Sequence, residues 1–432
     1  MRVCVSGLWH LGTGTAACLA AAGHDVVGHD PDPQRVELLA SGRAPIQEPG
    51  LDALIGEGLA SGRLRFSSDV AAAAEEAQVV WISYDTPVDS SDRADPDSVV
   101  KAATDFFPSL AAGSVMLISS QLPVGSTRQL MRSFERLGED RAVAFAYSPE
   151  NLRLGTAIDS FTKPERIVVG VEDPNGRAVI TALLDPLGAP IEWMQIESAE
   201  MTKHALNVFL ATSIVYANEI AAICESVGAD VADVVRALRS DPRIGQRAYL
   251  GFGTGYAGGT LGRDVTFLAD LISARKIEAP LLTSLGPSNR HQQQWVRRAL
   301  CSQLGEMRGL RIGIWGLTYK PGTDTLRRSA SIELCEWLAD LGAIPAAHDP
   351  AVHALPPALA GRISLQPDAL SAARGADALV VMTPWPEYRL VPPDAVVAEL
   401  RRPVIVDPAR FLTLLFATDP RVRYSAVGLA RA

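Results

Sequence analysis

Residues 2–31, RVCVSGLWHLGTGTAACLAAAGHDVVGHDP, carry the pattern that decides the fold. The apolar run 2–6 is typical of a short buried strand, residues 7–12 predict a turn, and residues 13–22 predict a helix of small side chains. A second apolar strand follows at 25–29. This strand–turn–helix–strand order predicts the βαβ unit that opens a dinucleotide-binding domain.

The turn matches the dinucleotide fingerprint GxGxxG only in part. In that fingerprint, backbone amides at a helix N-terminus cradle a pyrophosphate, and the glycines let the backbone approach it closely. Gly7 and Gly12 supply the first and last glycines, but Trp9 stands at the middle one. The pyrophosphate therefore has to sit differently or meet a rearranged turn. A plain βαβ turn without a cofactor remains the alternative.

Asp30 ends the second strand, where a carboxylate can accept hydrogen bonds from the ribose diol of NAD and repel the 2′-phosphate of NADP. The sequence therefore favours NAD over NADP. The turn residues assigned to the cofactor are Gly7, Leu8, Trp9, His10, Leu11 and Gly12.

The strand pattern continues along the chain and then starts again. Further strands are expected at 79–83, 114–119 and 166–171, with helical stretches between several of them, which predicts a parallel, doubly wound sheet. The longest helical pattern covers 197–228. A new strand and turn begin at 310–315.

The second half echoes the first in its short motifs. His348-Asp349-Pro350 repeats His29-Asp30-Pro31, and Thr383-Pro384 repeats Thr86-Pro87. Two Rossmann-like domains joined by a helical segment are the simplest account of this α/β pattern. The expected domains are an NAD-binding domain 1–196, a central helical domain 197–308 and a nucleotide-binding domain 309–432.

Composition narrows the class of protein. With 432 residues, 47% hydrophobic content and a net charge of −9, the chain reads as a globular protein of two or three domains. It lacks a Lys/Arg-rich run and a stretch of the ~18 apolar residues that a membrane helix needs. Nucleic acid and membrane are therefore not expected as partners.

The five cysteines form no CxxC pair and no zinc-like cluster, so no metal site is expected. Each lies in an apolar stretch, and buried packing is the expected role of these thiols. Reduced thiols, together with an N-terminus that reads as mature fold and not as a signal peptide, favour the cytoplasm.

Ordered motifs along nearly the whole chain resemble the UDP-glucose and GDP-mannose dehydrogenase family. Besides the glycine turn, the matching segments are PIQEPGL (45–51), TP (86–87), LPVG (122–125), SPENLR (148–153), ALNVFL (205–210), DPRIG (241–245), GGTLGRD (258–264) and YKPGTD (319–324). The resemblance implies oxidation of the C6 hydroxyl of a nucleotide sugar to a carboxylate with two NAD, through a cysteine thiohemiacetal and thioester.

At the position of that cysteine this chain has Thr260. A threonine hydroxyl is hardly ionised near neutral pH, so it cannot replace a thiolate nucleophile. Three other departures accompany it: Gln121 stands where the family has a threonine, Leu154 where it has a glutamate beside the nicotinamide, and Gly262 where it has a proline. The covalent thioester route is therefore not expected.

Four polar residues retain the family pattern. Lys203 and Asn207 are spaced i,i+4 on one helix face, so both side chains can reach one substrate oxygen. The resemblance implies that this pair stabilises negative charge on that oxygen and that Asp264 partners the lysine and helps activate water. Glu150 of the SPE motif is also retained. These four residues can support alcohol oxidation without a cysteine.

The resemblance also implies further contacts. For the cofactor they are Arg35, Thr86, Pro87, Gln121, Arg263 and Arg327, and for the substrate Asn151, Leu152, Arg243, Tyr249, Leu250, Gly253, Tyr256, Tyr319 and Lys320. Arg243 matches an arginine that reaches the partner subunit's sugar, which implies a homodimer or higher homo-oligomer built on the long helix. The alternative for Arg243 is a charge at a helix terminus.

Three functions remain open from the sequence. The first is NAD-dependent oxidation of one hydroxyl of a nucleotide sugar or related nucleoside, stopping after two electrons. The second is four-electron oxidation to a uronate, with water adding directly to a bound aldehyde. The third is a non-catalytic nucleotide-sugar-binding subunit.

Overall fold

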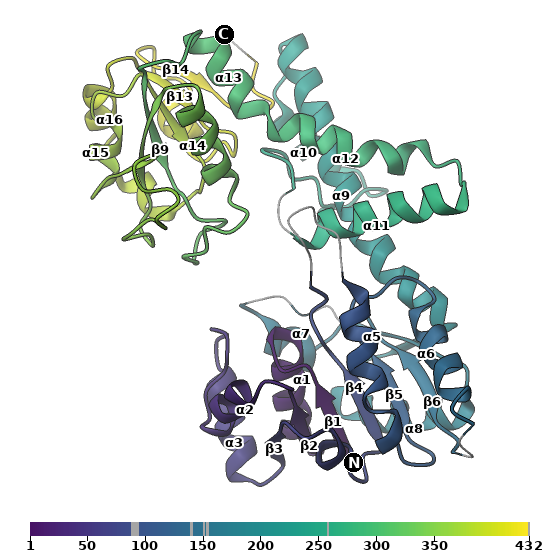
Figure 1. The fold of residues 1–432 in the computed structure, drawn as a ribbon. Helices are drawn as coiled ribbons and strands as arrows, with labels where there is room; N and C mark the ends of the chain where they lie inside the picture. Colours follow the sequence, from purple (N-terminus) through teal and green to yellow (C-terminus); the bar gives the residue numbers. More distant parts are fainter. Residues whose placement is uncertain (88–94, 139–140, 150–151, 153–154, 257–258, 431–432) are drawn as a thin grey trace. The chain divides into compact units, whose positions relative to one another are not determined.

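The computed structural model describes residues 1–87, 95–138, 141–149, 152, 155–256, 259–430. These residues form two compact units, Met1–Leu206 and Asn207–Ala432, whose boundary lies inside one long helix. Each unit contains a twisted sheet flanked by helices (Figure 1).

The first unit is built on an eight-stranded sheet in the order β3-β2-β1-β4-β5-β6-β7-β8. The strands are β1 Arg2–Ser6, β2 Asp25–His29, β3 Leu64–Ser67, β4 Val79–Ile82, β5 Val115–Ile118, β6 Ala144–Tyr147, β7 Ile167–Val171 and β8 Ile191–Met194. All pairs are parallel except β6 with β7, which is antiparallel. The expected wholly parallel sheet is therefore corrected at one pair.

Alternating side chains of the strands pack against helices on both faces. Val3 and Val5 of β1 point into one cluster with α1, α3 and α8, whereas Cys4 points into the other with α4, α5 and α6. The helices are α1 His10–Ala21, α2 Pro33–Ala40, α3 Leu51–Ala60, α4 Val70–Ala74, α5 Pro96–Thr104, α6 Ser126–Glu135, α7 Ala157–Thr162 and α8 Pro174–Leu184. This three-layer arrangement leaves the carboxyl ends of the strands free to form a site.

Helix α1 begins at His10, three residues before the sequence pattern placed it. Gly7 adopts a φ of +97°, which turns the chain sharply after β1, and the Thr13 amide already donates to the Trp9 carbonyl. The last part of the predicted turn is therefore the first turn of the helix, and its amides face the carboxyl edge of the sheet.

The second unit contains a helical part and a six-stranded parallel sheet in the order β11-β10-β9-β12-β13-β14. The strands are β9 Arg311–Trp315, β10 Ile344–His348, β11 Ser364–Leu365, β12 Ala378–Val381, β13 Val404–Val406 and β14 Arg423–Ser425. The helices are α9 Ile196–Val227, shared with the first unit, α10 Val231–Ser240, α11 Gly259–Arg275, α12 Pro280–Gln293, α13 Trp295–Leu304, α14 Ala330–Asp340, α15 Ala369–Ala373, α16 Pro393–Glu399 and α17 Thr413–Phe416. The α/β fold class with two Rossmann-like sheets and a long central helix is confirmed.

Four of the five cysteines are buried, as expected, but Cys301 on α13 is exposed. The prediction of buried packing was wrong for Cys301 because its position faces away from the apolar side of α13, which buries Trp295, Val296 and Ala299.

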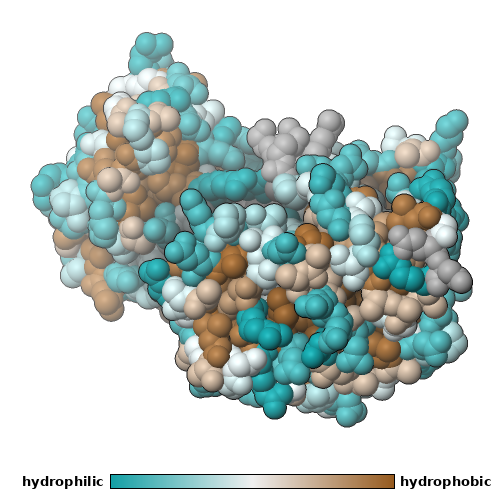
Figure 2. Space-filling model, turned by 60° about the horizontal axis from the view of Figure 1, so that its bottom comes forward, coloured by the Kyte–Doolittle hydropathy of each residue, from teal (hydrophilic) through white to brown (hydrophobic). Residues whose placement is uncertain are grey.

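Helix α9 is the one described helix that is long and apolar enough to cross a membrane by length and composition, with 39% of its most apolar window buried. Hydrophobic and hydrophilic residues are interspersed over the surface seen in Figure 2.

Candidate active site

The turn between β1 and α1 is shaped for a phosphate. A Cβ atom on Gly12 would lie 2.1 Å from the Gly7 carbonyl oxygen, so only glycine fits there. In the first turn of α1, His10 Nε2 and Thr13 Oγ1 are buried and have no hydrogen-bond partner among the described residues. Helix N-terminal amides and unpaired polar atoms are what a pyrophosphate requires. These residues therefore fit the phosphates of a dinucleotide.

Asp30 holds this turn from the end of β2. One oxygen of its buried carboxylate accepts the Leu8 amide at 2.8 Å, and the other accepts the Asp32 amide at 3.0 Å. Arg35 Nη1 donates to both oxygens, at 3.0 and 2.9 Å. The carboxylate predicted to bind the ribose therefore also holds the backbone of the turn. The Arg35 guanidinium neutralises the charge of this carboxylate.

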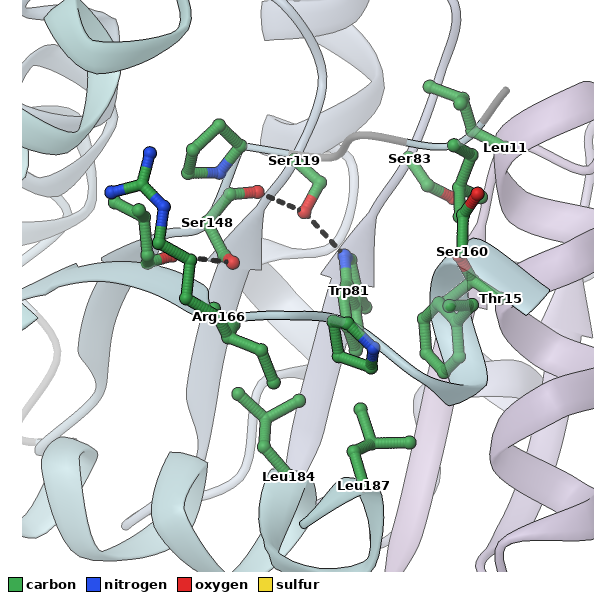
Figure 3. Close-up of a pocket in the computed structure, with 16 residues that line it drawn as sticks. Leu11, Thr15, Trp81, Ser83, Ser119, Ser148, Ser160, Arg166, Leu184 and Leu187 are labelled. Carbon is green, nitrogen blue, oxygen red and sulfur yellow. Dashed lines mark hydrogen bonds between the residues drawn. The ribbon is translucent and has the colours of Figure 1, made fainter. Parts of the chain in front are cut away.

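A partly open cavity of about 80 Å³ lies beside the turn, at the carboxyl ends of β4, β5 and β6 (Figure 3). Its wall includes Leu11, Leu152 and four serines. One of these serines, Ser119, accepts from Trp81 Nε1 at 2.8 Å and donates to the Ser148 carbonyl at 2.6 Å. The switch point of this sheet, where open α/β sheets bind ligands, lies at the neighbouring carboxyl ends of β1 and β4.

A hydrogen bond joins the loops after β4 and β5. Thr86 is buried, and its hydroxyl donates to the Gln121 carbonyl at 2.6 Å. Pro87 follows on the surface, and its carbonyl accepts the Asp95 amide. The structure therefore brings together Thr86 and Gln121, two of the predicted cofactor residues.

Polar side chains in the first turns of α9 form hydrogen bonds with the backbone of the loop after β5. The buried carboxylate of Glu200 accepts the Gly125 amide at 2.5 Å and the Thr127 amide at 2.9 Å, and so caps α6. His204 Nε2 donates to the Leu122 carbonyl at 3.0 Å. Lys203, also buried, lies between these two residues in the sequence. The loop that carries Gln121 is thus tied to the helix that carries Lys203.

Sequence reasoning missed Glu200 and His204. Burial raises the pKa of Glu200, against the lowering effect of the two amides. The available signal was the spacing of Glu200, Lys203, His204 and Asn207 at i, i+3, i+4 and i+7, which places four polar side chains on one helix face.

In the second unit, Asn207 and Asp264 are in direct contact. Asn207 Nδ2 donates to Asp264 Oδ2, and both side chains are buried. Thr260 lies one turn before Asp264 on α11, at the exposed start of that helix, and Arg263 is the residue before Asp264. The structure therefore places a hydroxyl, an amide and a carboxylate on two neighbouring helices.

The segment 249–256 forms the wall of a second cavity, of about 210 Å³, with Tyr249 and Gly253 among its lining residues. Side-chain amides from other elements hold the backbone of this segment. Asn218 accepts the Gly253 amide at 2.8 Å, Asn289 accepts the Tyr256 amide at 2.9 Å, and Gln292 donates to the Gly253 carbonyl at 2.6 Å.

These three amide side chains were also missed. Asn289 and Gln292 are buried polar residues at i,i+3 on α12, and that spacing was the available signal. Asn218 Nδ2 is buried and has no hydrogen-bond partner among the described residues, so it can donate to a group in the cavity it lines. Leu250 is buried beneath the same segment.

The other predicted residues are exposed or lie outside the described part. Arg243 is exposed and paired with Asp241, with Nη2 at 2.7 Å from the carboxylate. In the segment that follows β9, the side chains of Tyr319, Lys320 and Arg327 are exposed. Glu150, Asn151 and Leu154 lie outside the described residues. The described residues contain no group of three or more His, Cys, Asp or Glu that could hold a metal.

A phosphate cradle at the switch point of a Rossmann sheet, followed by a helix with buried polar side chains, defines a dinucleotide-dependent dehydrogenase. The profiles of three domains of one family match the chain in order. They are those of the UDP-glucose/GDP-mannose dehydrogenase family: the NAD binding domain over 1–187, the central domain over 197–291 and the UDP binding domain over 313–413.

Similar proteins cover the same length. A UDP-glucose 6-dehydrogenase of Rhizobium meliloti is 34% identical over 99% of both chains, and one of Haloferax volcanii is 32% identical over 96% of this chain and 97% of its own. The solved structure of a UDP-glucose dehydrogenase from Pyrobaculum islandicum has a TM-score of 0.86 at 29% identity, covering 99% of this chain and 98% of its own.

The chain belongs to the UDP-glucose/GDP-mannose dehydrogenase family. It is an NAD-dependent oxidoreductase that acts on a CH–OH group, and its match to a UDP binding domain supports a nucleotide sugar as the substrate. The predictions of the enzyme class and of NAD are confirmed.

Proposed function

We propose that this enzyme oxidises one hydroxyl of a nucleotide sugar or related nucleoside and stops after a single two-electron step. The observation that carries the proposal is Thr260, which stands at the exposed start of α11, one turn before the buried Asp264. A thioester intermediate needs a thiolate at this position, and a threonine hydroxyl does not supply one near neutral pH. The product is then an aldehyde or a ketone.

The residues that remain are sufficient for one oxidation. The hydroxyl proton passes to a carboxylate or amine, for which Asp264, Lys203 and Glu150 are the candidates, and the carbon loses a hydride. NAD, when bound, accepts that hydride and becomes NADH. Lys203 stabilises the negative charge that forms on the substrate oxygen, and Asn207 donates a hydrogen bond to the same oxygen. Each carbonyl group formed therefore yields one NADH.

The roles of the substrate residues are part of the proposal. We assign the nucleotide to the segment 249–256 and to Tyr319 and Lys320, because the cavity beside that segment contains the unpaired amide of Asn218. The match of residues 313–413 to a UDP binding domain supports the same assignment. The three-domain division at 196 and 308 is likewise a proposal, supported by the ranges of the three family profiles.

A homodimer built on α9 completes the proposal. Large apolar side chains are exposed at Phe209, Tyr216, Ile223 and Val227, spaced seven, seven and four residues apart. This is the seam of a helix that packs against another helix, and it would be a costly surface for a monomer. Arg243 then completes the partner's site. We place the protein in the cytoplasm, because its five cysteines are free thiols.

Four-electron oxidation to a uronate is the second candidate, favoured by the identity to UDP-glucose 6-dehydrogenases. The test is the amount of NADH formed per substrate across a panel of sugar nucleotides and nucleosides, with mass spectrometry of the product. One NADH with a carbonyl product supports the proposal, and two NADH with a carboxylate support the second candidate. No NADH from any substrate would favour a nucleotide-sugar-binding subunit and overturn both.

A further inference from the structure

Trp9 occupies the middle position of the glycine fingerprint, yet the turn keeps its form. Its backbone has φ −102° and ψ −138°, outside the positive-φ region that favours glycine. The neighbouring contacts are intact: the Gly7 amide donates to the His29 carbonyl at 2.9 Å, and the Leu8 amide donates to Asp30. The turn therefore accommodates a side chain at position 9 without a positive φ, and the position of the ring decides what the side chain can contact.

The indole ring lies on the β2 side of the turn. The guanidinium carbon of Arg35, from the first turn of α2, is 5.2 Å from the ring centroid. The same guanidinium donates to both oxygens of Asp30 at the end of β2. Trp9 is 44% exposed, so Arg35 covers only part of the ring. The three side chains form a continuous row: carboxylate, guanidinium and indole.

This row lies along the part of the site that receives adenosine. In Rossmann domains the pyrophosphate sits at the N-terminus of the first helix, and the adenosine ribose lies at the carboxylate that ends the second strand. An indole placed between these two points adjoins the adenosine half of the cofactor. Aromatic rings bind nucleobases by stacking, and a neighbouring guanidinium holds the ring in place by a cation–π contact.

We propose that Trp9, held by Arg35, is a binding residue for the adenosine half of NAD, so that the side chain replacing the middle glycine adds a contact to the cofactor. The exposed indole surface packs against the adenine or its ribose, while the pyrophosphate keeps its place at the amides of α1. This role concerns cofactor binding alone and is independent of which hydroxyl the enzyme oxidises.

The test is a calorimetric titration of the enzyme with 5′-AMP and with NAD, in the absence of a sugar nucleotide. Trp9→Ala is expected to weaken both ligands by a similar factor of about 10, the size of one base–aromatic stack. Trp9→Phe is expected to keep most of the affinity, because a smaller ring still stacks. Leu137→Ala, which truncates another exposed apolar side chain of the same unit, is the matched control and leaves both affinities unchanged.

Three results would overturn the proposal. Tighter NAD binding by Trp9→Ala or Trp9→Gly would show that the indole obstructs the cofactor. Unchanged affinities would show that the ring makes no contact. A loss for NAD without a loss for 5′-AMP would place the contact outside the adenosine half. Calorimetric melting of each variant shows that it is folded, and should Trp9→Ala not fold, Trp9→Leu replaces it, since leucine fills space without an aromatic face.

Discussion

Asn207 donates its side-chain amide to the buried carboxylate of Asp264, and this contact joins α9 to α11. An amide NH donates a hydrogen bond to a carboxylate without carrying a charge of its own. The contact therefore orients a candidate proton acceptor at the start of the helix that carries Thr260.

Removing this amide is expected to destabilise the protein. Asn207→Ala withdraws one donor from a buried carboxylate, and leaving such a group short of a hydrogen bond costs about 1–3 kcal/mol. Ser213→Ala on the same helix is the control, because the Ser213 hydroxyl is exposed and donates only to the Phe209 carbonyl one turn earlier. Scanning calorimetry compares the two variants. Equal melting temperatures would show that the Asn207–Asp264 contact contributes nothing to the fold.

We expect the charge on Asp30 to favour NAD over NADP, and we expect Arg35 to weaken this preference by neutralising part of that charge. Arg35→Gln leaves the Asp30 carboxylate without its cation and removes a positive charge that could attract a 2′-phosphate. The ratio of NADP to NAD dissociation constants is expected to rise by about fivefold, from an interaction of about 1 kcal/mol. Asp30→Asn is expected to lower that ratio. Titration of each variant with both cofactors measures this ratio. Improved NADP binding by Arg35→Gln would contradict the proposed effect of Arg35 on the Asp30 carboxylate.

Much of the fold followed from local sequence because its causes are local. Gly7 and Gly316 both adopt positive φ after a buried strand, and the amide of each donates to the histidine carbonyl that ends the next strand. The repeated His-Asp-Pro motif then places Asp30 and Asp349 where each accepts backbone amides of its own turn. Such short-range patterns identified both Rossmann-like domains.

The rest depends on contacts between distant segments. The antiparallel pairing of β7 with β6 depends on how the chain returns to the sheet, which strand patterning does not encode. In the sequence, Glu200 resembles an ordinary helix residue. Only the fold brings it to the N-terminus of α6, 75 residues earlier in the chain. Asn289 and Gln292 gain their roles in the same way. Residue types and motifs could therefore predict candidate site residues. They could not predict the contacts between distant segments that hold those residues in place.

The buried carboxylate of Glu200 gives a pH dependence with a defined sign. Burial raises its pKa in the folded protein above the unfolded value, so its contribution to stability is full below the unfolded pKa and is lost as pH rises through the folded pKa. The melting temperature of the wild type minus that of Glu200→Gln is therefore expected to fall as pH rises above about 4.3, the ordinary pKa of glutamate.

Glu197, one turn earlier on the same helix, provides a control of opposite sign. Hydrogen bonds from Arg128 lower its pKa, so its contribution is present above the unfolded pKa and is lost on acidification. The difference between the wild type and Glu197→Gln is expected to shrink as pH falls, and to be small because the side chain is partly exposed. A Glu200 difference that grew with pH would contradict the assignment.

The exposed seam on α9 predicts that association depends on Phe209, which is 66% exposed in the single chain. Phe209→Glu puts a charge into the expected helix–helix contact, where burial of each phenylalanine contributes about 1.5–3 kcal/mol. Sedimentation is expected to show a dimer for the wild type and a shift toward monomer for the variant. Leu390→Glu, at an exposed apolar residue outside α9, is the control. A monomeric wild type with full activity would exclude both the dimer and the sharing of Arg243.

The last prediction concerns Thr260. If oxidation stops after one hydride, Thr260 acts by shape or by a hydrogen bond, so Thr260→Ala is expected to keep substantial turnover. Lys203→Ala is expected to lose about 100-fold or more in kcat, because the substrate oxygen loses the cation that stabilises its developing charge.

Thr260→Cys is the sharper variant. A thiolate there can add to an aldehyde, and the thiohemiacetal can give up a second hydride to a further NAD, but only when the oxidised carbon is a primary alcohol. NADH per substrate and mass spectrometry of the intact protein distinguish the outcomes: a second NADH or a covalent adduct indicates C6 chemistry, and an unchanged single NADH indicates a ring hydroxyl. A Thr260→Ala variant as inactive as Lys203→Ala would defeat the non-nucleophilic role, because shape alone does not account for a loss of that size.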